Sequence, residues 1–302
     1  MTTVLITGGS GLIGMHLQKR LKERGYDVAI LSRAEKQQKD IQTFTWDLEK
    51  NEIQKEALET ADYIVHLAGV SIGEQRWTRK RKQEIIDSRV KTGELIHRKI
   101  KEQNTELRAF ISASAIGYYG TITSDKIFTE TDLPASDFLG ETCRQWEKMT
   151  DDFKDLEIRT VKIRTGVVLT KQGGALSKMA TPLKLGLGSA IGSGKQYLPW
   201  IHIKDLCDIY IKAIEDSQIE GAYNAVAPDH KTNKEFIRTL ARVLKRPLWF
   251  PNIPAIIMKL MFGKMSGILL EGSRISSAKL KEKGYTFLFP DLESALEDVY
   301  RK

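Results

Sequence analysis

The chain has 302 residues, of which 41% are hydrophobic and 28% charged, as is typical of a soluble globular protein. Its net charge is +8, but no aromatic residues interleave with clustered cations, so we expect no nucleic-acid partner. The two cysteines lack metal-ligand spacing, and we expect neither a metal site nor a disulfide framework. The N-terminus shows no signal-peptide pattern, and no apolar run approaches the ~20 residues that are needed to span a bilayer. The sequence therefore predicts a cytoplasmic protein without a membrane partner.

The first 170 residues alternate short apolar runs with helical patterns. Runs typical of buried strands occur at 4–6, 27–31, 63–67, 109–112 and 159–163, and helical patterns at 12–21, 80–101 and 140–153. The basic run Arg79–Lys82 opens the second helical pattern and is typical of a solvated helix face. Strict alternation predicts an α/β fold with right-handed crossovers, a Rossmann doubly wound parallel sheet.

After residue 170 the pattern changes. A glycine-rich loop at 186–194 is followed by helical patterns near 203–215 and 232–244, and prolines then precede a mostly helical end. We therefore expect a nucleotide-binding domain over 1–170, with segments around 200–225 returning to it. Residues 171–302 would form a smaller, mostly helical substrate lobe that includes a C-terminal subdomain at about 248–302.

The first strand is followed by a glycine-rich turn that carries the strongest chemical signal. Gly8, Gly11 and Gly14 lie between the strand and the helix, with Leu12 and Ile13 completing the motif. Glycine allows a tight turn and lets the backbone approach a pyrophosphate, which then meets the positive end of the helix. This context predicts a dinucleotide site.

The end of the second strand indicates which dinucleotide is bound. An acidic residue there would bind the ribose 2′-hydroxyl of NAD, but this chain has Ser32 and Arg33, which suit the 2′-phosphate of NADP. Asp47, after the third strand, is placed near the expected adenine, although a generic turn aspartate is an equal alternative. The sequence therefore predicts NADP as the cofactor.

These residues resemble the extended short-chain dehydrogenases/reductases. The resemblance is carried by the motifs at 7–14, 66–69, 112–115, 163–168 and 200–205. More narrowly, SASAIGYYG, KLGLG, IGSGKQYLPWIHIKD and GYTFLFPDLESAL are similar to atypical epimerase family proteins related to nucleoside-diphosphate sugar epimerases. The resemblance covers essentially the whole chain.

The resemblance implies further cofactor contacts. Leu67 and Ala68 would line the adenosine-ribose side, and Gly166 would lie near the nicotinamide. Glu84 and Arg89 would be additional NADP contacts, although both also fit an exposed helical pair.

The catalytic residues of this family are a serine and a Tyr-x-x-x-Lys pair, in which lysine lowers the tyrosine pKa. Ser114 matches the serine, but the expected pair falls on Leu139 and Cys143, or on Phe138 and Thr142 in the neighbouring register. None of the nine tyrosines has a lysine four positions on. The dyad is absent from this sequence.

Three interpretations of this gap stay open. Tyr118 or Tyr119 would serve as the acid, with Ser114 orienting the reacting oxygen. Alternatively, water, Cys143 or Glu141 would handle protons. Finally, the protein would bind NADP without catalysing a reaction, as a redox sensor or regulatory protein.

Other residues are weaker candidates for ligand contact. Lys195, Trp200 and His202 would face substrate, or the histidine would cap a helix, and Arg76 with Trp77 would clamp an anionic group or belong to a surface loop. The leading hypothesis is an NADP-dependent oxidoreductase or epimerase, monomeric or homodimeric, acting on a small hydroxylated or sugar-nucleotide-like substrate.

Overall fold

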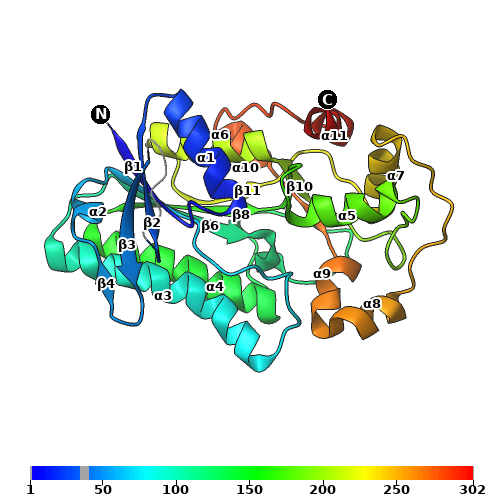
Figure 1. The fold of residues 1–302 in the computed structure, drawn as a ribbon, viewed down its shortest axis with the longest axis horizontal. Coiled ribbons are helices and arrows are strands. Elements are labelled where there is room, and N and C mark those ends of the chain that lie inside the picture. Colours follow the sequence, from blue (N-terminus) through cyan, green and yellow to red (C-terminus); the bar gives the residue numbers. More distant parts are fainter. Residues whose placement is uncertain (1, 35–40, 302) are drawn as a thin grey trace.

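A computed structural model describes residues 2–34 and 41–301 of the chain (Figure 1). Its centre is an eight-stranded sheet, parallel except for the antiparallel pairing of β3 with β4. The order is β11-β8-β6-β5-β1-β2-β3-β4. The strands are β1 (Thr3–Thr7), β2 (Asp27–Ser32), β3 (Gln42–Asp47), β4 (Glu52–Ile53), β5 (Tyr63–His66), β6 (Ala109–Ala115), β8 (Arg159–Thr165) and β11 (Gly221–Ala225).

Helices cover both faces of this sheet. One face carries α1 (Leu12–Glu23) and α6 (Ile203–Glu215), and the other carries α2 (Glu56–Glu59), α3 (Arg79–Gln103) and α4 (Phe138–Asp152). In β1, Val4 and Ile6 join the core under α1 and α6, whereas Leu5 joins the opposite core. The strand is continuously apolar because both of its faces are buried. The predicted Rossmann-type α/β fold is confirmed.

The second part of the chain builds a separate core beside the sheet. Leu176, Phe236, Leu240 and Leu296 pack there around Trp200. They belong to α5 (Gly174–Lys184), α7 (Asn233–Val243), α11 (Leu292–Tyr300) and the short parallel pair β9 (Val167–Leu169) and β10 (Trp200–His202). The chain returns to the large sheet in between, because α6 lies on one face and β11 forms its edge.

The remaining elements are short. The pair β7 (Ile127–Phe128) and β12 (Arg274–Ile275) ties the end of the chain to the segment before α4. A helical group lies away from the large sheet (Figure 1). It comprises α8 (Ala255–Phe262) and α9 (Gly267–Leu270), and α10 (Ala278–Glu282) follows it. Within the described ranges no helix is long and apolar enough to cross a membrane.

Candidate functional site

The candidate site lies at the carboxyl ends of β1 and β5. From β1 the chain builds the sheet through β2 and β3 in one direction, and from β5 through β6 and β8 in the other. In open α/β sheets, ligands bind where the direction of strand addition reverses. The topology therefore places the glycine turn after β1 at this switch point.

The glycine turn packs directly against the end of β5. Gly8 has a φ of +69°, and a Cβ there would lie 2.8 Å from the carbonyl oxygen of Leu67. A Cβ on Gly14 would lie 2.6 Å from the carbonyl oxygens of Gly8 and Gly9. Any side chain at either position would collide with backbone, so glycine is required for the turn itself.

The first turn of α1 presents unpaired backbone donors. Gly11 is the N-cap and provides no side-chain acceptor, and the first turn contains no acidic residue. The N–H groups of Leu12, Ile13 and Gly14 have no carbonyl partner within the helix. With the positive end of the helix dipole, these donors suit an anionic group such as a pyrophosphate.

Thr7 and His66 position Leu67 and Ala68 opposite this turn. The Thr7 hydroxyl accepts hydrogen bonds from the amides of Leu67 and Ala68, both at 3.2 Å, and lies 2.8 Å from Nδ1 of His66. Burial lowers the pKa of His66 to about 4, so its ring is neutral. Thr7 therefore donates to Nδ1, and Nε2–H donates to the Arg89 carbonyl at 3.2 Å. This chain of bonds fixes the loop that starts at Leu67.

At the second strand, Arg33 is exposed and forms no ion pair with any residue in 2–34 or 41–301. Ser32 ends β2 and accepts a hydrogen bond from the Ala34 amide at 3.4 Å. Asp47, by contrast, accepts from the amides of Glu49 and Lys50 at 2.9 and 3.1 Å. These bonds are those of a generic turn aspartate, which was one of the two predicted alternatives for Asp47.

Arg89 and Glu84 lie on α3 but face different partners. Arg89 donates to the carbonyls of Ile85 and Val70 at 2.8 and 3.0 Å, and burial lowers its pKa to about 10. Glu84 pairs with Arg81 at 3.2 Å. Arg81 is buried and donates to the Ser71 carbonyl, so the basic run is not entirely solvated. Both arginines thus hold the loop after β5.

A second glycine-rich segment lies over the start of α1. A Cβ on Gly174, at the beginning of α5, would be 3.3 Å from Cδ2 of Leu12. From α5, Lys178 donates to the Gly73 carbonyl at 3.2 Å. The glycine pair at 173–174 was the available sequence signal, but no role was predicted for this segment.

Gly166 lies at the β8–β9 junction, where a Cβ on this residue would lie 2.9 Å from the carbonyl oxygen of Pro199.

The positions of the family's Tyr-x-x-x-Lys pair are occupied by a buried apolar contact. Leu139 and Cys143 face Gly117, whose added Cβ would lie 3.3 Å from Leu139 Cβ and 3.8 Å from the Cys143 sulfur. Burial raises the pKa of the Cys143 thiol to about 12. In the other register, Thr142 donates to the Phe138 carbonyl within α4. Neither register places a proton-transfer pair here.

The predicted catalytic residues instead surround a buried ion pair. Arg164 binds both oxygens of Glu147, each at 2.8 Å, and Ser114 donates to the same carboxylate at 2.7 Å. Burial opposes ionisation of Arg164, but Glu147 raises its pKa. This pair was not predicted from the sequence, because Glu147 and Arg164 lie among other charged residues of a helical and a strand pattern, and nothing in their spacing sets them apart.

Tyr119 is enclosed in the same network. Its hydroxyl accepts from Arg164 at 2.9 Å and donates to Asn224 at 2.7 Å. Burial raises its pKa to about 12, and only 3% of the residue is exposed. Tyr119 is therefore a structural partner of β8 and β11.

Tyr118 is half-buried and lies on the outer side of the network. Its ring covers the Arg164 guanidinium, with 3.5 Å between the guanidinium carbon and the ring centroid. Burial raises its pKa, although Arg164 opposes this shift. Of the two tyrosines, Tyr118 is the more exposed residue.

In the second lobe, Trp200 and His202 are buried. The Trp200 indole donates to the Asp229 carbonyl at 3.1 Å, and His202 accepts from the Lys204 amide at 3.2 Å to cap α6. Burial lowers the pKa of His202 to about 4. These are packing and capping roles, whereas Lys195 is exposed.

Arg76 and Trp77 link the loop after β5 to neighbouring elements. Arg76 donates to the carbonyls of Leu260 and Met261 at the end of α8, at 2.6 and 2.9 Å. Trp77 packs on Phe138 with 4.8 Å between ring centroids. The loop is thus attached to both α8 and α4.

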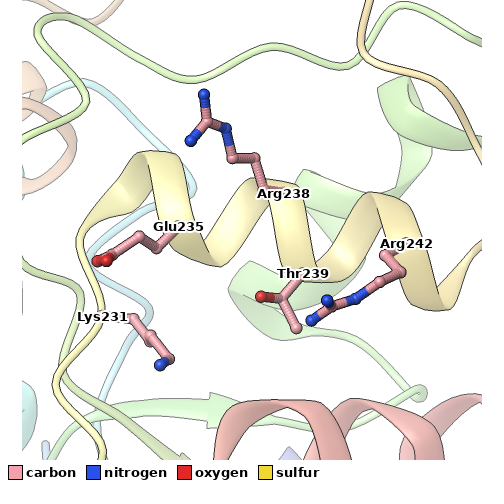
Figure 2. A pocket seen from close by; sticks show the side chains of 5 residues that line it. All are labelled: Lys231, Glu235, Arg238, Thr239 and Arg242. Carbon is pink, nitrogen blue, oxygen red and sulfur yellow. The ribbon is translucent and has the colours of Figure 1, made fainter.

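A groove of about 430 Å³ lies on α7, away from this site (Figures 1 and 2). Its cations Lys231 and Arg242 already pair with Asp229 and Glu293. Figure 2 shows Arg238 pointing away from both. The groove therefore does not form a cluster of free cations. No group of three or more potential metal ligands occurs among the described residues.

The profile of the NAD dependent epimerase/dehydratase family matches residues 4–225. The chain belongs to this family. A domain of unknown function, DUF1731, matches residues 253–299.

Relatives and solved structures match over nearly the full length. Epimerase family protein YfhF of Bacillus subtilis is 38% identical over 98% of this chain and 97% of that protein, and murine Epimerase family protein SDR39U1 is 34% identical over 98% and 99%. The crystal structure of human SDR39U1 with NADPH has a TM-score of 0.87, 32% identity and 99% coverage of both chains. The predicted relationship to epimerase family proteins is confirmed.

The contact between the glycine turn and β5 gives a stability prediction. Gly8→Ala should lower the free energy of unfolding by about 1–3 kcal/mol more than Gly25→Ala. Both glycines have positive φ, but a Cβ on Gly25 would meet nothing within 4 Å. Urea denaturation measures both values. Equal losses would show that left-handed strain alone, and not collision with Leu67, requires glycine at position 8.

The buried ion pair gives a second prediction. Glu147→Gln should cost about 3–5 kcal/mol because Arg164 stays buried without its counter-charge. Combining it with Arg164→Met should restore part of that loss in urea denaturation. Glu141→Gln, which breaks the exposed pair with Arg144 on the same helix, should cost about 1 kcal/mol or less. A double variant no more stable than Glu147→Gln would contradict this account.

Proposed function

We propose that this chain binds NADP at the switch point between β1 and β5 and acts as an NADP-dependent oxidoreductase or epimerase. The observation that carries the proposal is the glycine turn, whose close approach to β5 and unpaired α1 amides form a cradle that a Cβ would fill. The NADPH in the structure of human SDR39U1 supports the same cofactor. Residues 1–170 and about 200–225 would carry this site, and the rest of 171–302 would carry the substrate lobe.

Individual residues have defined parts in this proposal. The amides of Leu12, Ile13 and Gly14 bind the pyrophosphate, and Ser32 and Arg33 bind the 2′-phosphate. Leu67 and Ala68 flank the adenosine side, with Glu84 and Arg89 holding the adjoining loop, and Gly166 lies toward the nicotinamide. Asp47 stabilises its own turn by accepting hydrogen bonds from the amides of Glu49 and Lys50. When bound, the cofactor supplies a hydride donor or acceptor.

For the proton, the geometry favours Tyr118 over Tyr119. Tyr119 is buried and its phenol bonds both Arg164 and Asn224, whereas Tyr118 is half-buried and its raised pKa keeps its phenol neutral. A neutral phenol can donate a proton to a substrate oxygen as hydride arrives at its carbon. Ser114 donates its hydrogen to Glu147, so toward a substrate hydroxyl it can only accept. The substrate class would be a small hydroxylated or sugar-nucleotide-like molecule.

A non-catalytic NADP sensor is the second candidate function. It is favoured by one observation, the buried contact of Leu139 and Cys143 where the family's proton-transfer pair would lie. In that case NADP would be bound without turnover.

The cofactor assignment is tested by Arg33→Ala. Loss of charged hydrogen bonds to the 2′-phosphate, about 1.5–3 kcal/mol, should weaken NADPH binding roughly 10- to 150-fold. NADH binding should not change, since it lacks that phosphate. Fluorescence titration measures both ligands, and Arg238→Ala, another exposed arginine, is the matched control. Unchanged NADPH affinity in Arg33→Ala would refute the 2′-phosphate contact.

The proton-donor assignment is tested by Tyr118→Phe. Across a panel of carbonyl compounds and sugar nucleotides, kcat for NADPH oxidation should fall about 10²–10⁴-fold while NADPH affinity is retained. Tyr119→Phe should instead lower the unfolding temperature, because it removes a partner of Arg164. Activity unchanged in Tyr118→Phe would contradict the assignment, and NADPH binding without wild-type turnover on any panel member would favour the sensor.

A further inference from the structure

The helix α8 and two neighbouring loops expose a large apolar surface. Trp249 is 78% exposed, Leu260 73% and Ile256 67%. We call this region the α8 surface, and it comprises Leu185, Leu187, Leu248, Trp249, Phe250, Ile256, Ile257, Leu260 and Met261. Single exposed apolar residues are ordinary, but a contiguous apolar patch marks an interaction site.

Parts of the α8 surface lie next to one another. Leu187, Phe250 and Ile257 line one open depression of about 280 Å³. On α8, residues 256, 257, 260 and 261 share one side of the helix, because i and i+4 positions are neighbours. Met258, on the opposite side, is buried. Figure 1 shows α8 at the edge of the molecule, away from the large sheet.

The cations around the α8 surface have no acidic counterparts nearby in the sequence. Between Phe236 and Leu270 the chain contains no aspartate or glutamate. Five cations of this stretch are exposed and, within 2–34 and 41–301, form no ion pair: Arg238 on α7 and, nearer to α8 in the sequence, the four cations Lys245, Arg246, Lys259 and Lys264. Residues 245–250 are exposed without interruption, so two cations adjoin Trp249 and Phe250.

The charges around the α8 surface favour one class of binding partner over another. A second copy of the chain in a two-fold dimer would bring the same surface, and the same cations, against itself. Like charges brought together in this way oppose association. An anionic partner has complementary charge. The combination of protruding tryptophan and aliphatic side chains with flanking lysine and arginine is the pattern of segments that lie in a membrane interface.

We propose that the α8 surface docks the protein on an anionic membrane surface. Trp249, Phe250 and the exposed side of α8 would enter the boundary between headgroups and acyl chains, and the four cations would contact lipid phosphates. This departs from our sequence-based expectation of no membrane partner, which rested on the absence of a spanning segment. The proposal is independent of the proposed enzymatic function.

The test is co-sedimentation of the full chain with vesicles of phosphatidylcholine alone or with one quarter phosphatidylglycerol. We expect binding at least tenfold stronger to the anionic vesicles, and weaker binding as salt is raised. Ile256→Ser with Leu260→Ser, and separately Lys245→Gln with Arg246→Gln, should each reduce binding at least fivefold. Leu133→Ser and the pair Lys281→Gln with Lys283→Gln are matched controls, exposed elsewhere on the molecule, and should bind like wild type.

Two results would overturn the proposal. One is equal sedimentation of wild type with and without anionic vesicles. The other is a lipid-free dimer in sedimentation equilibrium that Ile256→Ser with Leu260→Ser dissociates, which would assign the surface to a second copy. Circular dichroism of each variant verifies folding, which these exposed substitutions should preserve.

Discussion

The ion pair between Glu147 and Arg164 is the interaction on which the arrangement of the site depends. It joins α4 to β8, and through Ser114, Tyr119 and Asn224 it also reaches β6 and β11. A buried charge is costly unless it is paired and hydrogen-bonded, so each partner constrains the others. These bonds thereby fix the position of α4 relative to the carboxyl ends of the three strands β6, β8 and β11. Tyr118 rests on the outer face of this unit, and its ring position follows from that of Arg164.

The two ends of the candidate site differ in the kind of group they present and in how that group is positioned. At the glycine turn the binding groups are backbone amides, positioned by steric exclusion of side chains and by Thr7. At the Ser114 end the groups are side chains, positioned by a buried network whose hydrogen bonds are strengthened by the low dielectric around them. The family's usual proton-transfer pair would have to occupy the space that Leu139 and Cys143 fill. A glycine turn of the usual form therefore lies on the same sheet as a region that lacks the family's usual pair.

Sequence predicted the elements whose signals are local. The apolar runs, the helix after Gly11 and the absence of a Tyr-x-x-x-Lys pair follow from short-range spacing, and α3 and α4 begin and end within two residues of expectation. The ion pair did not follow, because Glu147 and Arg164 meet only after α4 packs on the sheet. Burial of Arg81 depends likewise on the Ser71 carbonyl. For α8 the sequence predicted only a mostly helical end of the chain, and tertiary packing is needed to show which side of this helix stays uncovered.

The attachment of Arg76 to the end of α8 links two regions that differ in their packing. Carbonyls at a helix C-terminus carry partial negative charge, so the guanidinium stabilises the last turn of α8 as well as holding the loop. The same loop is also held by Lys178 at Gly73, by Arg81 and Arg89, and by the packing of Trp77 on α4. It begins at the residues that face the glycine turn. A displacement of the loop away from the glycine turn would therefore break the Arg76 bonds to α8 together with these other contacts. Movement of the last turn of α8 and movement of this loop are thereby coupled through one guanidinium, so the two regions are not independent of each other.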